Sequence, residues 1–274
     1  MNLTDLETKG FVVIKGFFST PEIELLKALH AIQKTKVSEK GFSSKRYNIL
    51  FSVIPLFLKF KISELLKDIS AKTNITVTTT QHHITMYDTD FGAWGWHQDL
   101  EPFLLFQDAY NSLNCWFPII KDSSDTSGLS VVSAHKLSEM FPDLFNSKFY
   151  GKGGKSFKLH DTHTEITDGV YGDKFSLPVN LDDIGESPII EVGDILILRH
   201  DTIHRTQPNS NDRVAVSIRC YNENGIFSLE KMLDTGGDSK QDSFEKYEIF
   251  AKIKHYLESN NKQQETLGML FKSI

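Results

Sequence analysis

The sequence has little cysteine, no surplus of positive charge and no long apolar run. Its two cysteines, Cys115 and Cys220, lie far apart within apolar, strand-like segments, so the chain holds neither a disulfide framework nor a paired-cysteine metal site. With 30 Lys and Arg against 36 Asp and Glu, the formal net charge is −6, which argues against a nucleic-acid-binding protein. The most apolar stretch, residues 49–62, is interrupted by proline and lysine and is too short for a transmembrane helix.

The composition is otherwise that of an ordinary globular protein. Apolar residues make up 39% and charged residues 24% of the 274 positions, which is enough to build a buried core. We find no repeat, low-complexity tract or clear linker, so we expect a single domain over residues 1–274. Residues 1–10 lack the basic and apolar regions of a secretory signal. We therefore expect a cytoplasmic protein with no membrane partner, and its oligomeric state stays open.

Short β-branched segments separated by turn residues fill much of the chain. Apolar residues at helical spacing predict helices that start near Pro21, at about residues 55–69 and at about 243–258. Short strands with turns between them favour a barrel or a double-sheet jelly roll with flanking helices over a parallel α/β sheet. The expected strands are residues 10–14, 75–85, 113–119, 128–133, 189–190, 194–198 and 213–221.

Residues 146–188 do not follow this pattern of short strands and turns. The segment contains several glycines and shows no sustained period. Long irregular insertions in compact domains are typical of lids and binding loops, so we expect a lid-like insertion here. Its charged residues, such as Lys155, suit either an anionic small molecule or a solvated loop.

The segment GWHQD at residues 95–99 places a histidine and an aspartate two positions apart. In an extended strand, side chains two apart point the same way, so His97 and Asp99 can direct an imidazole and a carboxylate at one point. A further histidine from a distant strand would complete the set of two histidines and one carboxylate found in non-haem Fe(II) oxygenases. Because this set has no thiolate and only three protein donors, it disfavours a closed structural zinc site.

Further segments follow in a fixed order along the chain. They are GFVVIKGFF at 10–18, WHQDL at 96–100, NCWFPI at 114–119, SGLSVVSAHK at 127–136, GD at 193–194 with HRTQPN at 204–209, and RVAVS at 213–217. Taken together they resemble the phytanoyl-CoA dioxygenase family of Fe(II)- and 2-oxoglutarate-dependent oxygenases. The resemblance covers roughly residues 10–221. It implies a mainly β fold with flanking helices, a double-stranded β-helix also described as a distorted, cupin-like jelly roll.

The resemblance also implies site residues. His97, Asp99 and His204 match the iron ligands, and Arg213 matches the arginine that pairs with the distal carboxylate of 2-oxoglutarate. A planar guanidinium suits that role, because it can grip a carboxylate with two parallel hydrogen bonds. The positions that the resemblance associates with 2-oxoglutarate are Arg213, Thr206, Trp116 and Gln81.

Two assignments have competitors. Arg219 lies on the same strand face as Arg213, and the turn before Arg213 is short compared with many relatives. The sequence after Arg213 favours it as the anchor, which leaves Arg219 for the substrate or for a contact around the ligands. His200 is an alternative to His204 as the distal ligand. The alignment of this segment with the family motif favours His204. The other candidates for substrate contact are His83 and Trp94.

The resemblance implies a reaction class. A small molecule would be oxidised at an unactivated C–H bond, in the first place by hydroxylation, while 2-oxoglutarate is decarboxylated to succinate and CO2 and O2 is consumed. A carboxylate at position 99 disfavours halogenation, because related halogenases carry a small residue there. Desaturation and ring closure stay open, and so does a catalytically silent jelly-roll protein that binds a metal or a small ligand. The substrate is not identified by the sequence.

Overall fold

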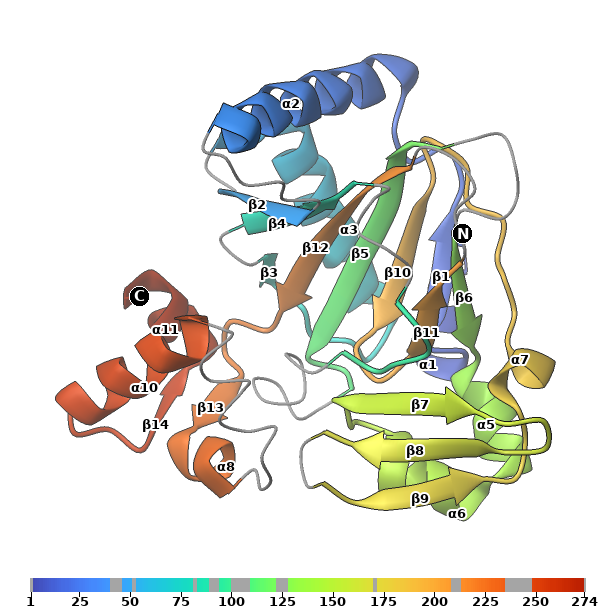
Figure 1. The fold of residues 1–274 in the computed structure, drawn as a ribbon. Coiled ribbons are helices and arrows are strands. Elements are labelled where there is room, and N and C mark those ends of the chain that lie inside the picture. The colour runs from blue at the N-terminus through green and yellow to red at the C-terminus, as the bar shows by residue number, and fades with distance from the viewer. Residues whose placement is uncertain are drawn as a thin grey trace.

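A computed structural model describes residues 2–39, 46–50, 53–80, 83–88, 94–99, 109–121, 128–169, 172–207, 213–234 and 248–273. Figure 1 shows a large twisted sheet with helices α2 and α3 beside it, a smaller layer of strands below, and a group of C-terminal elements to one side. The short helix α1 (Asp5–Thr8) precedes the first strand.

The main sheet contains seven antiparallel strands. Alternate residues along a strand point to opposite faces, and β12 shows this clearly. Val216 and Ile218 pack on the outer side of the sheet, whereas Ala215 packs on the inner side. The order is β1 (Phe11–Ile14), β10 (Ile195–Arg199), β5 (Ser112–Ile120), β12 (Val214–Tyr221), β4 (His83–Tyr87) and β2 (Arg46–Leu50), and β3 (Thr79–Thr80) also pairs with β12.

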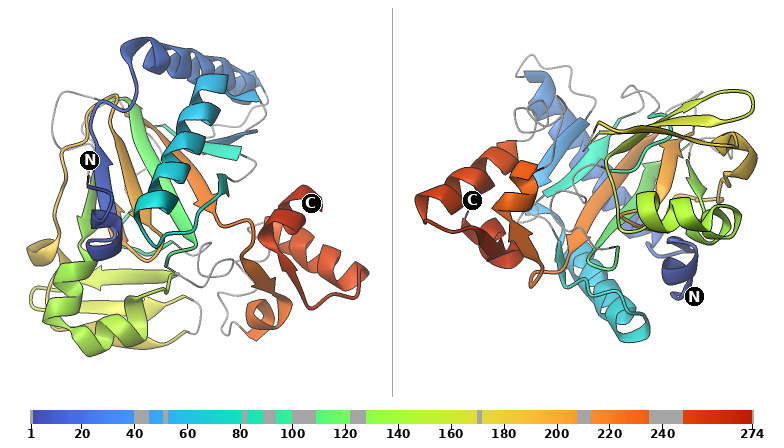
Figure 2. Two further views of the ribbon diagram at one scale, coloured as in Figure 1. Left: turned by 180° about the vertical axis from the view of Figure 1, so that it is seen from behind. Right: turned by 90° about the horizontal axis from the view of Figure 1, so that it is seen from below.

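Two helices pack in the outer core of the main sheet. Helix α2 (Thr20–Glu39) begins where the sequence predicts, because the Glu22 carboxylate accepts hydrogen bonds from the backbone N–H and hydroxyl of Ser19 at 2.7 and 2.9 Å. Helix α3 (Leu56–Lys72) lies across the back of the sheet in Figure 2. Its buried residues recur every three or four positions and form one apolar stripe. They are Leu58, Ile62, Leu65, Leu66 and Ile69.

Replacing Ile62 with alanine should lower the free energy of unfolding by about 2–5 kcal/mol, because the side chain is fully buried and its loss leaves a cavity. Urea unfolding followed by circular dichroism measures the change. Phe60 is the matched control, since it lies in the same helix with 66% of its surface exposed, and Phe60→Ala should change stability by less than about 0.5 kcal/mol. Equal losses in both variants would contradict this packing of α3.

The inner face of the main sheet packs against a second, smaller sheet. Strands β6 (Leu129–Val132) and β11 (Ile203–Thr206) pair in antiparallel register. Val131 of β6 packs with Trp116 and Leu196 of the main sheet in one apolar cluster. Two antiparallel sheets that face each other across a core, with helices outside, make the distorted jelly roll that the sequence predicts. The predicted mainly β fold is thus confirmed.

The segment 146–188, which the sequence predicts to be irregular, is largely regular where it is described. Its strands are only four or five residues long, so each window of sequence is too short to show a period. The ring of Phe149 packs against those of Phe157 and Phe175 in an apolar cluster that also includes Val132 of β6 and Ile203 of β11. Helices α5 (Ala134–Met140) and α6 (Pro142–Leu144) precede the segment. Its own elements are the π-helical turn η3 (Phe145–Phe149), which begins one residue earlier, β7 (Lys155–Leu159), β8 (Thr164–Asp168), β9 (Lys174–Leu177) and α7 (Leu181–Ile184).

The C-terminal elements form a small unit beside the main sheet (Figure 2). The ring of Tyr221, at the end of β12, contacts that of Phe271 with 4.8 Å between centroids. The predicted helix at 243–258 agrees with the observed one in its described part, and residues 243–247 lie outside the described residues. The elements are β13 (Ile226–Ser228), α8 (Leu229–Asp234), α10 (Glu248–Ser259), β14 (Gln264–Thr266) and α11 (Leu267–Ser273). Among the described helices, none has the length and apolar character needed to span a bilayer.

Two predicted strand regions differ from the structure. Residues 75–78 and 189–190 are not in strands, although Ile75, Val77 and Ile190 are buried. Thr76 and Thr78 each donate one backbone hydrogen bond, to the Tyr110 and Tyr221 carbonyls at 2.9 and 3.0 Å, but residues 75–78 lie outside the regular ladders of the sheet. The two cysteines are fully buried free thiols with 3.9 Å between their sulfur atoms, as expected for core residues.

Candidate metal centre

Residues 94–99 form a short extended segment between β11 and β7. His97 and His204 exchange two backbone hydrogen bonds, with N···O distances of 2.9 and 3.0 Å. On its other side, the Gln98 N–H donates to the Lys155 carbonyl at 2.9 Å, and the Gly154 N–H donates to the Asp99 carbonyl at 2.9 Å. The segment therefore joins the β6–β11 pair to β7–β9 as one layer of strands. Its extended backbone is what sends alternate side chains to one face.

Three side chains converge on one point from this segment and from β11. His97 Nε2 lies 3.7 Å from Asp99 Oδ1, and His204 Nε2 lies 4.0 Å from Asp99 Oδ2. One nitrogen or oxygen atom from each of the three lies within 4.8 Å of the other two. Within the described part of the chain, no other set of three or more His, Cys, Asp or Glu residues is grouped this closely.

Backbone carbonyls orient both imidazoles. His97 Nδ1 lies 2.7 Å from the Gly95 carbonyl oxygen, and His204 Nδ1 lies 3.0 Å from that of Thr202. A carbonyl oxygen can only accept, so each Nδ1 carries the proton and each Nε2 keeps a lone pair for the shared point. Burial and the neighbouring His97 lower the pKa of His204 to about 4, so this imidazole is neutral near pH 7.

Asp99 is paired with an arginine from the main sheet. Arg219 Nη1 lies 2.6 Å from Asp99 Oδ2. Burial alone would raise the pKa of Asp99, but the positive charge of Arg219 outweighs it and holds the pKa below its ordinary range. The carboxylate is therefore ionised at neutral pH, and its Oδ1 is turned toward His97.

The chemistry of these three donors fits a divalent first-row metal ion. Two imidazole nitrogens with free lone pairs and one ionised carboxylate match the set of two histidines and one carboxylate that suits non-haem Fe(II). A structural zinc site would normally bring a fourth protein ligand, often a thiolate. Three protein donors leave coordination positions for other molecules, which is the property of a catalytic rather than a structural metal site.

Of the residues expected to contact 2-oxoglutarate, three are described. Arg213 is buried directly before β12, and its Nη1 donates to the Gly128 carbonyl at 3.4 Å, so the side chain reaches from the main sheet to the start of β6. Burial lowers the pKa of Arg213 to about 10, which leaves it cationic at pH 7. Trp116 is buried on the inner face of β5, and Thr206 is half-buried in β11, two residues after His204. Gln81 lies outside the described residues.

The candidates for substrate contact differ in how close they lie to the cluster of three residues. Arg219 contacts Asp99, so of the two roles that the sequence leaves open for it, the observed position corresponds to a contact around the ligands. Trp94 is 47% exposed, and its ring centroid lies 5.6 Å from that of His97. For His83 only the backbone, in β4, is described. His200 is buried in the turn between β10 and β11 and does not belong to the cluster of three.

Lys155 contradicts both interpretations that the sequence suggests for it. Its side chain is buried in β7, and its Nζ lies 3.1 Å from Asp168 Oδ2 in β8. The residue is therefore neither in a solvated loop nor available to an anionic ligand. The reason is the sheet of β7–β9, which the sequence does not reveal.

Sequence reasoning missed several polar residues around the site. Gln98 is 2% exposed, and its side-chain amide donates to the Asp201 carbonyl at 2.6 Å. On the inner face of the main sheet, Asn114 accepts a hydrogen bond from the Ser217 hydroxyl at 2.6 Å. A signal for Asn114 and Ser217 exists, because each is a polar residue inside an otherwise apolar strand. Gln98 has no comparable signal, since the middle residue of a His-X-Asp motif is unconstrained by spacing.

Comparison with known proteins shows the fold. No family model and no curated protein matches the chain. Among solved structures, the chain is similar to EctD from S. alaskensis, crystallised with 2-oxoglutarate and 5-hydroxyectoine, with a TM-score of 0.51 and 10% identity over 82% of this chain and 76% of that one. HygX from Streptomyces hygroscopicus, crystallised with nickel and 2-oxoglutarate, matches with a TM-score of 0.49 and 14% identity over 80% of this chain and 85% of that one.

Proposed function

We propose that this protein is an Fe(II)- and 2-oxoglutarate-dependent dioxygenase that oxidises, in the first place hydroxylates, an unactivated C–H bond of a small molecule. The reaction would decarboxylate 2-oxoglutarate to succinate and CO2 and consume O2. The ordered motifs between residues 10 and 221 support a relationship to the phytanoyl-CoA dioxygenase family. The fold shared with EctD is compatible with this proposal.

One observation carries the proposal, namely the convergence of His97, Asp99 and His204 with both imidazole Nδ1 atoms held by backbone carbonyls. A histidine whose other ring nitrogen donates to a carbonyl is the usual arrangement of a metal ligand. The main-chain hydrogen bonds between His97 and His204 fix the two ligands relative to each other. The site is therefore pre-organised for a cation by backbone geometry.

Each side chain of the site would have its own role in the reaction. His97, Asp99 and His204 would hold the metal ion, which supplies the redox chemistry that activates O2 when 2-oxoglutarate is bound. Arg213, a buried cation between the two sheets, would bind the distal carboxylate of 2-oxoglutarate and orient its keto acid toward the metal. Arg219 keeps Asp99 ionised and holds its Oδ2. Trp116 would exclude water from the inner face.

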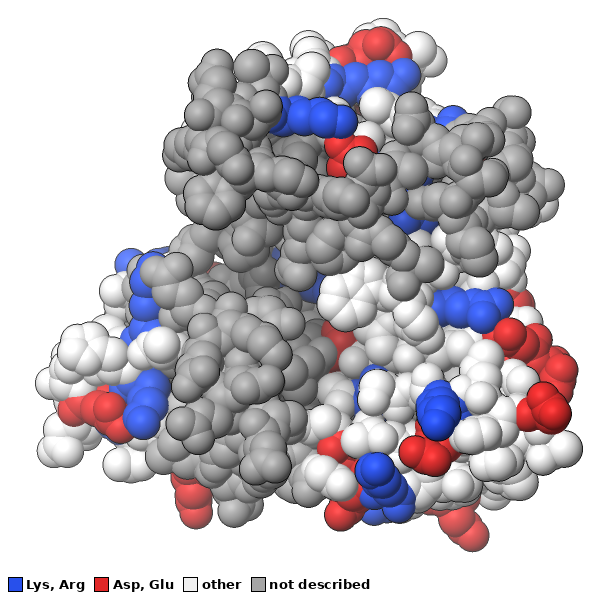
Figure 3. Space-filling model, viewed as in Figure 1, with Lys and Arg blue, Asp and Glu red and all other residues white. Residues whose placement is uncertain are grey.

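A small molecule is the substrate class that we propose. On the face shown in Figure 3, the described Lys and Arg residues are interspersed with Asp and Glu, so this part of the surface presents no continuous basic area for nucleic acid. Trp94, half exposed beside His97, is in a position to contact a ligand that approaches the metal.

The proposal is tested by adding Fe(II) and 2-oxoglutarate to the metal-free protein under anaerobic conditions. We expect a visible metal-to-ligand charge-transfer band that needs both additions, because the keto acid must bind to the iron. On exposure to O2 with cell metabolites, succinate should form together with an O2-dependent mass gain in one compound. A folded protein that gives no band would refute the assignment of 2-oxoglutarate, and a band without succinate would favour a silent binding protein.

A further inference from the structure

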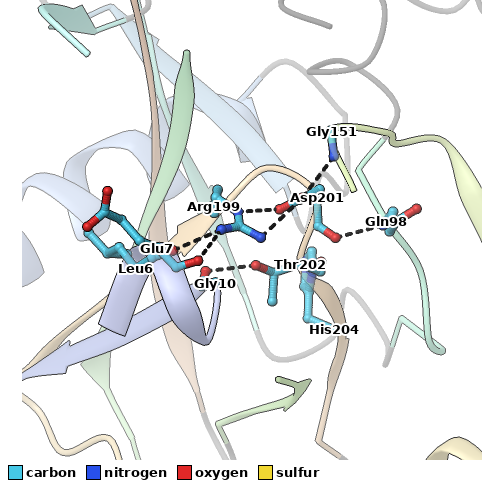
Figure 4. Close-up of polar contacts among 9 residues, drawn as sticks. All are labelled: Leu6, Glu7, Gly10, Gln98, Gly151, Arg199, Asp201, Thr202 and His204. Atoms are coloured by element: carbon cyan, nitrogen blue, oxygen red, sulfur yellow. Dashed lines mark hydrogen bonds and ion pairs between the residues drawn. The ribbon is translucent and has the colours of Figure 1, made fainter. Parts of the chain in front are cut away.

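We infer that a buried clamp made of Gln98, Arg199 and Asp201 positions the two halves of the metal centre relative to each other. One half is the His-X-Asp segment, and the other is His204 on β11. The inference rests on the proposed function, because it assigns positioning residues to the metal site proposed above. Figure 4 shows the residues of the clamp and their partners.

The centre of the clamp is a buried ion pair across the turn between β10 and β11. Arg199 Nε and Nη2 lie 2.7 and 3.3 Å from the two carboxylate oxygens of Asp201, and both side chains are almost completely buried. The Gly151 N–H also donates to Asp201 at 2.9 Å. Arg199 Nη1 donates to the carbonyls of Leu6 and Glu7 at 3.2 and 2.7 Å. The pair therefore ties the turn to helix α1 and to the segment before β7.

The same turn orients His204. The Thr202 hydroxyl donates to the Gly10 carbonyl at 2.7 Å, and the Thr202 carbonyl is the group that His204 Nδ1 contacts. Gly10 has a φ of +84°, and a Cβ there would lie 2.7 Å from the Thr202 hydroxyl oxygen. The backbone at Gly10 thus fits closely against Thr202. A shift of the turn would move the carbonyl that sets the direction of the His204 ring.

Gln98 connects the turn to the other half of the site. It stands between His97 and Asp99, so its side chain points away from the metal face and into the interior. There its amide nitrogen donates to the Asp201 carbonyl at 2.6 Å. A single buried residue therefore links the backbone that carries two of the ligands to the turn that orients the third. Groups that hydrogen-bond directly to a metal ligand, as the Thr202 carbonyl does to His204 Nδ1, commonly affect metal affinity about 10- to 100-fold, and Gln98 holds the turn that carries this carbonyl.

A second buried aspartate provides a matched control. Asp194 holds the opposite end of β10, where its carboxylate accepts hydrogen bonds from Lys15 Nζ and from the Gly16 and Glu191 N–H groups at 2.8 to 2.9 Å. Like Asp201, it is an almost fully buried carboxylate that pairs with a cation and caps backbone N–H groups. None of these bonds involves His97, Asp99 or His204. Its loss should affect stability alone.

The experiment measures Co(II) binding by the metal-free protein through visible absorption, together with urea unfolding of each variant. Gln98→Met, which nearly preserves volume and removes one hydrogen bond, and Asp201→Asn should each weaken Co(II) binding about 10- to 100-fold and alter the absorption envelope of the bound ion. Asp194→Asn should lower the urea midpoint but leave the Co(II) affinity within about twofold of the wild type.

The outcomes separate this inference from the proposed function. If Gln98→Met and Asp201→Asn bind Co(II) as the wild type does, the clamp is only structural and the inference is wrong, while the proposed metal site stands. If Asp201→Asn does not fold, Gln98→Met decides the question alone. If the wild-type protein binds no Co(II), both the metal site and its positioning are refuted.

Discussion

Replacing Asp99 or His204 with alanine should abolish both the anaerobic charge-transfer band and the formation of succinate. Each substitution removes one of only three protein donors, and the loss of a ligand should weaken metal binding more than the roughly 10- to 100-fold effect of partners that merely orient ligands. We therefore expect at least about a hundredfold loss of Fe(II) affinity. Titration with Fe(II) under anaerobic conditions, with circular dichroism to verify folding, measures it.

The control for this experiment is His200→Ala. His200 is buried like His204 and lies four positions earlier, but it is outside the cluster. This variant should keep the band and the metal affinity even if it loses stability. The opposite result, in which His200→Ala loses the band and His204→Ala keeps it, would reassign the distal ligand and contradict the geometry described above.

Replacing Arg213 with alanine should raise the KM for 2-oxoglutarate by roughly 30-fold or more and leave Fe(II) binding close to that of the wild type. Loss of one partner from a buried, hydrogen-bonded charge pair costs about 2–5 kcal/mol, and each 1.4 kcal/mol corresponds to a factor of ten. Arg213→Lys should recover only part of the affinity, because an ammonium group cannot form two parallel bonds to a carboxylate. The dependence of succinate formation on 2-oxoglutarate concentration gives these values.

Arg219→Ala separates the two arginines. Arg219 lies 2.6 Å from Asp99, so its loss should change Fe(II) affinity and the position of the charge-transfer band more than the KM for 2-oxoglutarate. The two residues are six positions apart along the strand, which puts their Cα atoms roughly 20 Å from each other. A sharp rise in that KM for Arg219→Ala, together with a normal value for Arg213→Ala, would show that the anchor is Arg219.

Part of the candidate site could be predicted from the local spacing of residues in the sequence. The two-residue spacing of His97 and Asp99 requires only that the backbone be extended, and the structure gives that segment strand partners on both sides. His204 needed the ordered motifs as well, because spacing alone cannot say which distant histidine reaches the same point. The core strands were predictable from their apolar and β-branched residues, and nearly all residues of β5, β10 and β12 are buried.

The remaining features depend on contacts between distant segments, which no local pattern encodes. From the sequence alone, Lys155 is interpreted as a charged residue of a loop, because its partner Asp168 lies on a different strand, β8. Arg219 contacts Asp99 across 120 positions of sequence, and this contact joins the main sheet to the smaller layer. The alternation of side chains along the strand predicts which face of the sheet Arg219 lies on, but it does not predict its partner. Arg199 is only two positions from Asp201, but the other partners of Asp201, Gln98 and Gly151, come from distant parts of the chain that no local pattern indicates.

The strand order of the main sheet also has a kinetic consequence. Strand β1 pairs with β10, so Phe11 lies opposite Leu198, and β12 occupies a place between β5 and β4 although it is synthesised after all of its sheet neighbours. Such non-local pairing slows folding, because long loops must close before their contacts form. On the ribosome the N-terminal strands emerge first and wait for their partners. The candidate metal centre, whose donors lie at residues 97, 99 and 204 and whose Asp99 contacts Arg219, can therefore be completed only after residues up to 219 have left the ribosome.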